Sequence, residues 1–313
     1  MQDGKLCLQF QHILDTFPSS VHECLQTIPD AGGMLAPEHC LAVMESLNIS
    51  AENLMLRLLP IARLYSATEI SNFKVGAVAK AGMSKNANEI ALFLGANIEF
   101  PAQALTQTIH AEQSAVINAW LQGAEQIDAI AVTAAPCGHC RQFLYELEGS
   151  HKLTVILQNP GLGEVAEYKL TDLLPQAFGP HQLGMKTGLM APADQQPDLT
   201  LQSSSNDPFV LEAMAAAKKS YAPYSKNYAG CAIQTANDKM YTGRYAENAA
   251  FNPSLSPLHS AIIRLTMDNL DSDIKITRAV LVERPTSISQ RAVCKLLLQT
   301  VAPGVNLEYF EAV

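Results

Sequence analysis

The sequence lacks the features that carry a protein into or across a membrane. It has no run of about 18 apolar residues, the length that a membrane-spanning helix needs. The first residues, Met-Gln-Asp-Gly-Lys-Leu, also lack the charged, apolar and cleavage-site segments of a secretory signal. We therefore expect no membrane partner and a cytoplasmic protein.

Charged residues are also scarce, and most of them are acidic. They make up 16% of the 313 residues, with 21 Lys and Arg against 30 Asp and Glu and a formal net charge of −9. A protein that binds polynucleotides is expected to carry a basic track for the phosphates, and none is visible here. We therefore expect no nucleic-acid partner.

Disulfide-like cysteine spacing is absent as well. The chain has seven cysteines. We expect buried, reduced thiols at the five that are scattered along it, namely Cys7, Cys24, Cys40, Cys231 and Cys294. What the sequence does have is 48% hydrophobic residues, which at this length is enough for two domains with well-buried cores.

The most informative segment is His110-Ala111-Glu112, which is followed by Pro136-Cys137-Gly138-His139-Cys140. One imidazole and two thiolates make a tetrahedral zinc site whose fourth position is left for water, whereas a structural site has four protein ligands. The sequence therefore predicts that His110, Cys137 and Cys140 bind one zinc ion. Glu112 is then a spare carboxylate beside the metal, available for acid/base chemistry.

The spacing also predicts how these residues come together. Residues 113–123 read as a helix that begins near His110, residues 129–135 as a buried strand, and residues 137–147 as a second helix opened by Pro136. His110 and Glu112, at i and i+2, reach one metal only if the first helix points end-on at it. We infer that two helix N-termini converge on the zinc and help to hold anionic ligands.

Each half of this pattern has an ordinary alternative. A lone C-x-x-C is more often a redox pair or half of a structural zinc site, and a lone H-x-E is mostly coincidence. Glu112 alone could be a first-turn carboxylate favoured by the helix dipole. The combination, however, is the signature of zinc-dependent nucleobase deaminases, in which the glutamate is the general acid/base and not a ligand.

The chain resembles the bacterial cytidine deaminases of the long, homodimeric type. Three further segments carry the resemblance together with the zinc motif: Ser71-Asn72-Phe73-Lys74-Val75-Gly76-Ala77, Gly95-Ala96-Asn97-Ile98-Glu99-Phe100 and Tyr245-Ala246-Glu247-Asn248-Ala249-Ala250-Phe251-Asn252-Pro253. They span about residues 55 to 260, in the order of the family. The resemblance implies hydrolysis of cytidine and deoxycytidine to uridine and deoxyuridine with loss of ammonia, as in pyrimidine salvage.

The resemblance also implies roles for single residues. Asn97 and Glu99 would bind the ribose hydroxyls, Phe73 would line the nucleoside pocket, and Glu112 would move protons. Each subunit would hold one Zn²⁺. The C-terminal domain would help to complete the active site of the other subunit, with Ala250 as a candidate for substrate contact across the dimer.

Local patterns alone leave these substrate-binding roles open. Phe73 begins an alternating run and could equally be a core residue of a strand. Asn97 and Glu99 flank Ile98 and would share one side of a strand, which could be a solvated outer face. His139 falls on a different helical face from the cysteines, so we interpret it as a polar or packing residue.

The second half of the chain echoes the first. Gly95–Val116 resembles Gly243–Ile262, and Phe73-Lys-Val-Gly-Ala-Val resembles Tyr228-Ala-Gly-Cys-Ala-Ile. When Ser114-Ala115 is aligned with Ser260-Ala261, Ser256 replaces His110 and Leu258 replaces Glu112, while His259 falls opposite Gln113 and reads as structural. The second copy is therefore predicted to bind no zinc.

Alternating helices and strands predict duplicated three-layer α/β/α domains of the cytidine-deaminase type, each with a mixed sheet. We expect an N-terminal helical segment (1–55), a catalytic zinc domain (56–185), a linker rich in Pro, Gln, Ser and Asp (186–208) and a degenerate zinc-free domain (209–313).

Three other functions share the motif. A polynucleotide base deaminase would need positive charge and a channel for flanking nucleotides. A zinc-stabilised scaffold would use the ligands to hold its fold, with Glu112 incidental. A deaminase for another aminated pyrimidine or a blasticidin-type nucleoside has the same spacing.

Overall fold

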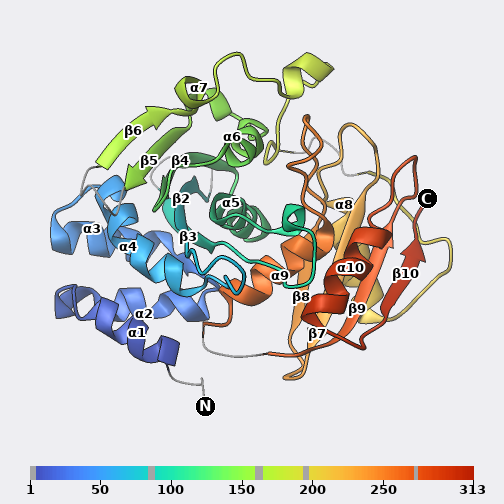
Figure 1. Cartoon of the computed structure of the whole chain (residues 1–313), viewed down its shortest axis with the longest axis horizontal. Coiled ribbons are helices and arrows are strands. Elements are labelled where there is room, and N and C mark those ends of the chain that lie inside the picture. The colour runs from blue at the N-terminus through green and yellow to red at the C-terminus, as the bar shows by residue number, and fades with distance from the viewer. Residues whose placement is uncertain (1–4, 84–88, 159–164, 193–196, 271–273) are drawn as a thin grey trace.

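Two mixed β-sheets, each covered by helices, stand side by side in the computed structural model, which describes residues 5–83, 89–158, 165–192, 197–270 and 274–313 (Figure 1). This arrangement confirms the predicted duplicated α/β fold. No helix in these ranges is long and apolar enough to cross a membrane.

The first sheet has the strand order β1-β3-β2-β4-β5-β6. Strands β4 and β5 are parallel and the other neighbours are antiparallel, so the sheet is mixed as predicted. Its strands are β1 (Met34–Leu35), β2 (Gly76–Gly82), β3 (Ile90–Ala96), β4 (Gln126–Val132), β5 (Thr154–Gln158) and β6 (Val165–Lys169).

Helices surround this sheet. Those of the N-terminal segment, α1 to α3, lie together beside the edge that β1 forms (Figure 1). The helices of this half are α1 (Lys5–Leu14), α2 (His22–Asp30), α3 (Pro37–Leu47), α4 (Ala51–Leu64), α5 (Ala111–Leu121), α6 (Gly138–Tyr145) and α7 (Leu170–Leu173).

Two glycines show that the first sheet lies between two helical layers. A Cβ on Gly76 would press on the backbone of α4, and a Cβ on Gly95 would overlap that of α5. Gly95 pairs with Ala77, the neighbour of Gly76. Because side chains alternate between faces along a strand, the two helices cover opposite faces.

The second sheet repeats this plan with the strand order β10-β9-β7-β8, in which β9 and β10 are parallel. Gly230 is pressed against α8 and Gly243 against α9, again on opposite faces. Its elements are α8 (Pro208–Lys218), β7 (Ala229–Thr235), β8 (Met240–Arg244), α9 (Pro257–Met267), β9 (Ile276–Glu283), α10 (Arg291–Val301) and β10 (Leu307–Glu311).

Helices α5 and α9 lie against each other between the two sheets (Figure 1). Every residue of α5 from Ala111 to Trp120 is buried, because the sheet covers one side of the helix and α9 another. One continuous apolar core joins the two halves, and a second, smaller core lies in the C-terminal half, between α8 and its sheet. The helix that carries the zinc motif is thus held from both halves of the chain.

The structure describes most of the chain between the two halves. Of the expected linker 186–208, residues 193–196 lie outside the described part of the structure. Leu201 forms a bridge with Ala312, so this end of the linker lies beside the C-terminus. The other expected boundary, between residues 55 and 56, falls inside α4, which begins at Ala51, where the side chain of Ser50 accepts a hydrogen bond from the backbone of Asn53.

Candidate active site

Three potential metal ligands meet at the N-termini of two helices. His110 is the N-cap residue of α5, Cys137 is the N-cap residue of α6, and Cys140 lies in the first turn of α6. The predicted order of helix, strand and helix and the convergence of the two helix N-termini are therefore confirmed. The β4 strand runs between the two helices in the sequence, so both helices begin at the end of the sheet where β4 ends.

The spacing of the ligand atoms suits zinc. The Cys137 Sγ lies 3.6 Å from the His110 Nδ1 and 3.6 Å from the Cys140 Sγ, and all three atoms lie within 4.8 Å of one another. A tetrahedral zinc ion with ordinary bond lengths would separate sulfur from nitrogen by about 3.6 Å and the two sulfurs by about 3.8 Å. The three side chains could thus hold zinc without a large rearrangement.

The two thiols differ in how easily each loses its proton. Hydrogen bonds with Cys140 and with His110 lower the pKa of the Cys137 thiol to about 3. The hydrogen bond to Cys137 and burial raise the pKa of Cys140. A coordinating cation deprotonates a thiol outright, so a zinc ion bound by both sulfurs would replace the proton of Cys140.

Glu112 lies beside the ligands and is almost fully enclosed. Its residue is 4% exposed, and burial is the main cause that raises the pKa of its carboxyl. It lies in the first turn of α5, two residues after the N-cap His110, and it contacts Cys140. A carboxyl group in such a place can hold a proton and pass it on.

A pocket of about 300 Å³ joins this group to the predicted substrate-binding residues. A volume near 300 Å³ is at the small end of the range for ligand sites. The structure brings Phe73, Asn97 and Glu99 together with His110, Glu112 and Cys137 in its lining, which also includes Ser71, Val75, Thr108, Ala111, Ala134 and Ala135.

One interpretation of the alternating pattern made Phe73 a core residue, and the structure contradicts that interpretation. It precedes β2 and is 62% exposed. Asn72 before it has a left-handed backbone (φ 56°), which turns the chain at this point. The side chain of Phe73 is therefore available to a ligand at the mouth of the pocket.

Asn97 and Glu99 follow β3 and hold the loop that carries Phe73. The Asn97 Oδ1 accepts a hydrogen bond from the Val75 N (2.9 Å), and its Nδ2 donates to the Phe73 O (2.9 Å). The Glu99 carboxylate accepts from the backbone and hydroxyl of Ser71. Burial would raise the pKa of Glu99, but these hydrogen bonds outweigh it and hold the pKa below its usual value.

Ala250 lies apart from this pocket within one chain. It is exposed in a turn, where its N–H donates to the Asn248 Oδ1 at 3.0 Å. It is not among the residues that line the zinc pocket.

Gln113 is a site residue that sequence reasoning passed over. It is fully buried, its Oε1 accepts from the His110 N (3.1 Å), and its Nε2 donates to the Pro253 O (3.3 Å) of the second half. A glutamine three residues after an N-cap is a recognisable capping signal. His139, 3.2 Å from Gln113, stacks on His110 with 5.4 Å between ring centroids, and so has the packing role that we inferred.

The second half keeps the same frame without the ligands. Ser256 is the N-cap residue of α9, as His110 is of α5, and Leu258 stands where Glu112 does. His259 repeats the capping place of Gln113 and lies 3.0 Å from the Gln107 O. Burial lowers the pKa of His259 to about 4, consistent with the structural role predicted for it.

Buried polar groups fill the second copy of the site. Glu283 is fully buried and accepts hydrogen bonds from the Asn227 Nδ2 and the Gln290 N, and Gln290 is the N-cap residue of α10. Among the described residues, the only group of three or more His, Cys, Asp or Glu side chains placed to hold a metal is that of His110. Within its described residues, the second half thus has no such ligand set.

In the segment that contains Phe73, the echo between the halves is displaced by one residue from the expected alignment. Glu247 accepts from the backbone of Tyr224 and Ser225 as Glu99 does from the backbone of Ile70 and Ser71. Counting on from each serine places Asn227, and not Tyr228, in correspondence with Phe73.

Sequence models of the cytidine and deoxycytidylate deaminase zinc-binding region match the chain twice, over residues 49–157 and over residues 170–295. The first match contains the three potential metal ligands and Glu112. The second falls mainly on the half that has lost them.

Curated relatives match along most of the chain. The chain is 38% identical to a cytidine deaminase of Aliivibrio fischeri, over 92% of this chain and 97% of the relative. It is 38% identical to a cytidine deaminase of Vibrio atlanticus, over 95% and 96% of the two chains. It is 46% identical to a cytidine deaminase of Shewanella halifaxensis over 74% of this chain and 72% of the relative.

Proposed function

The chain belongs to the cytidine and deoxycytidylate deaminase family, and on this premise we propose that it is a zinc-dependent cytidine deaminase. The reaction adds water to cytidine or deoxycytidine and yields uridine or deoxyuridine with ammonia. The observation that carries the proposal is the meeting of His110, Cys137 and Cys140 within 4.8 Å, with the buried Glu112 in the same pocket.

The zinc ligands in this proposal are His110, Cys137 and Cys140, with one ion per subunit. Zinc, when bound, lowers the pKa of water in its open position to about 7. Glu112 is the catalytic proton carrier. It takes one proton from the attacking water and gives it to the ring nitrogen next to C4, as the water oxygen bonds to C4.

Glu112 then moves a second proton. The hydroxyl oxygen on C4 releases this proton to the carboxylate, which delivers it to the exocyclic amine. The bond between C4 and nitrogen breaks, ammonia leaves, and the carbonyl of uridine forms. Burial of Glu112 supports this role. Burial disfavours the ionised carboxylate, so the carboxylate takes up a proton more readily than an exposed one would.

Phe73, Asn97 and Glu99 form the substrate-binding part of the proposal. Asn97 and Glu99 bind the ribose hydroxyls, and Phe73 covers the nucleoside from the pocket mouth. Both polar residues also hydrogen-bond to the loop of Phe73, so contact with the ribose would position this ring at the same time.

The assembly in this proposal is a homodimer in which Ala250 contacts the substrate of the partner subunit. Its exposure in a turn supports this, because a neighbouring chain can reach it. The test mixes two inactive variants, Glu112→Gln and Ala250→Trp. Recovery of activity on mixing would show sites shared between subunits, while a monomeric mass by light scattering would contradict the dimer.

The remaining parts of the proposal concern the domains and the cellular role. We assign residues 1–55 to a helical segment, 56–185 to the catalytic domain, 186–208 to the linker and 209–313 to the degenerate domain, and limited proteolysis tests these limits. We also place the enzyme in the cytoplasm and in pyrimidine salvage. The pocket's lining, with Glu99 and Glu112 and no Lys or Arg, supports an uncharged nucleoside as substrate.

The direct test follows the ultraviolet absorbance of cytidine with purified protein before and after treatment with a zinc chelator. We expect deamination that the chelator abolishes and added zinc restores. A protein that binds zinc but leaves cytidine unchanged would instead support a zinc-stabilised scaffold. Deamination of single-stranded DNA or RNA in preference to cytidine would support a polynucleotide enzyme.

A further inference from the structure

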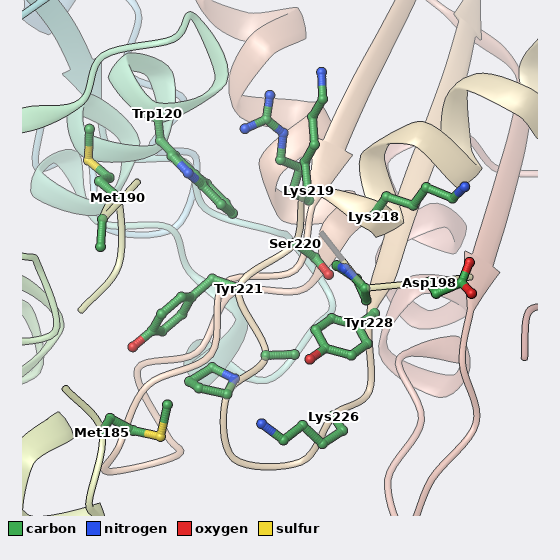
Figure 2. Close-up of a pocket in the computed structure, with 15 residues that line it drawn as sticks. Trp120, Met185, Met190, Asp198, Lys218, Lys219, Ser220, Tyr221, Lys226 and Tyr228 are labelled. Carbon is green, nitrogen blue, oxygen red and sulfur yellow. The ribbon is translucent and has the colours of Figure 1, made fainter. Parts of the chain in front are cut away.

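A second cavity, of about 660 Å³, lies between the two halves of the chain and shares no lining residue with the zinc pocket. Trp120 at the end of α5 and Tyr221 border one side of it, and Lys218 and Tyr228 lie on the other (Figure 2). Its volume is in the range of small-molecule sites, and clefts between domains are common places for such sites.

The lining of this cleft pocket has the opposite charge to the rest of the protein. It contains four of the chain's 21 basic residues and only one of its 30 acidic residues, Asp198. The four cations are Lys218, Lys219, Lys226 and Arg244. In the described part of the chain, none of the four forms an ion pair. In a protein with a net charge of −9, these cations attract anions to this cleft.

Arg244 is the cation whose surroundings are most telling. Its guanidinium lies over the Trp120 ring, 5.1 Å from the centroid, and no described acceptor bonds to it. Burial lowers the pKa of the Arg244 guanidinium, and no carboxylate among the described residues forms an ion pair with this partly buried charge. A bound anion would supply the missing acceptors, and guanidinium groups suit phosphate oxygens.

A structural explanation accounts for two of the cations only. Lys218 and Lys219 lie at the C-terminus of α8, where positive side chains are favoured by the helix dipole. Lys226 lies in a turn with a left-handed backbone, and Arg244 ends the strand β8. At neither of these positions does a helix dipole favour a positive side chain. Aromatic side chains, namely Trp120, Tyr221 and Tyr228, line the same cavity, and a base can stack on aromatic rings.

We propose that this cleft pocket binds a nucleoside triphosphate, with the phosphates on the cations and the base against Trp120 and the neighbouring tyrosines. Charge alone would accept any polyphosphate, and the aromatic side chains alone would accept a neutral nucleoside. Both features in one cavity favour a ligand that combines the two.

The single tryptophan makes this proposal directly measurable, since Trp120 is the one tryptophan of the chain and lines the pocket. The experiment titrates the zinc-loaded Glu112→Gln protein, saturated with cytidine to occupy the zinc pocket, with CTP or ATP and records tryptophan fluorescence. We expect a saturable change that weakens as salt is raised, because salt screens the phosphate contacts. Tripolyphosphate is expected to bind more weakly.

Two variants and one control test the residues. Arg244→Gln is expected to raise the apparent Kd by about tenfold, the effect of losing one charge-assisted hydrogen bond. Lys219→Ala with Lys226→Ala changes only exposed residues and is expected to weaken binding without affecting the fold. Lys152→Ala removes an exposed lysine outside the pocket and should leave the Kd unchanged.

Several results would overturn the proposal. They are the absence of a saturable fluorescence change with any nucleotide, an unchanged Kd in both pocket variants, or a loss of affinity in Lys152→Ala. Tripolyphosphate binding as tightly as the nucleotides would exclude the role of the aromatic rings. None of these readouts depends on deamination, so failure here would leave the proposed function untouched.

Discussion

The hydroxyl of Tyr221 donates a hydrogen bond of 2.8 Å to a carboxylate oxygen of Glu146, at the end of the helix that carries Cys140. Glu146 is fully buried, and it also accepts from the hydroxyl of Tyr224 and from the Ala249 N. Three groups of the degenerate half thus hold one residue of the catalytic half, beside the zinc helix α6.

Removal of this hydroxyl should weaken the attachment of the two halves. Tyr221→Phe leaves a buried carboxylate with one donor fewer, and we expect the free energy of unfolding to fall by about 1–3 kcal/mol. Urea denaturation measures the change. Tyr168→Phe, on the exposed strand β6, is the matched control, and equal losses in both variants would contradict the special role of Tyr221.

Replacement of Glu112 should abolish proton transfer while leaving the metal in place. We expect Glu112→Gln to lower kcat by about 10²- to 10⁴-fold or more, since this range is the usual contribution of a general acid/base. Metal analysis should still find one zinc per chain, because the glutamate is not a ligand in the proposal. Near-normal turnover in this variant would rule out the assigned mechanism.

Glu99 should affect substrate binding through the ribose and through the Phe73 loop. Glu99→Gln keeps the size of the side chain but removes its charge and weakens its hydrogen bonds with Ser71. We expect kcat/KM for cytidine to fall at least tenfold, mainly through a higher KM. For the wild-type enzyme, kcat/KM should fall by the same factor when cytidine is replaced by an analogue without ribose hydroxyls. For Glu99→Gln, the same change of substrate should lower kcat/KM little further.

His259 should make stability depend on pH in the acid range. Its pKa falls from about 6.5 in the unfolded chain to about 4 in the fold, so the unfolded state binds more protons between these values. Stability should therefore decrease as the pH is lowered from about 6.5 to 4. His259→Gln copies the capping residue of α5 and should make this decrease shallower. Melting temperatures of the wild type and of His259→Gln, measured across this pH range, test the expectation. Parallel curves would contradict the assignment of the pH dependence to His259.

The zinc motif could be predicted because its information is local. His110 and Cys137 are each the N-cap residue of a helix, so short-range spacing and capping place their side chains. The fold class followed from alternating elements in the same way. The pairing of Ser256 with His110 could also be found, since both halves keep the same helix start.

Long-range contacts are what the sequence could not provide. Tyr221 and Glu146 lie 75 residues apart, and no local pattern indicates that they meet. The exposed place of Phe73 depends on hydrogen bonds between its loop and Asn97, more than twenty residues later. The filling of the second site by Glu283 and Asn227 depends likewise on the packed tertiary structure.

The contact between α5 and α9 lies within a single polypeptide, and this has a consequence for how the enzyme behaves when it is scarce. Two separate subunits joined by the same surface would dissociate as their concentration fell. A tethered pair experiences an effective concentration set by its linker, which is commonly millimolar and independent of dilution. The degenerate half therefore remains beside the catalytic half at any level of expression.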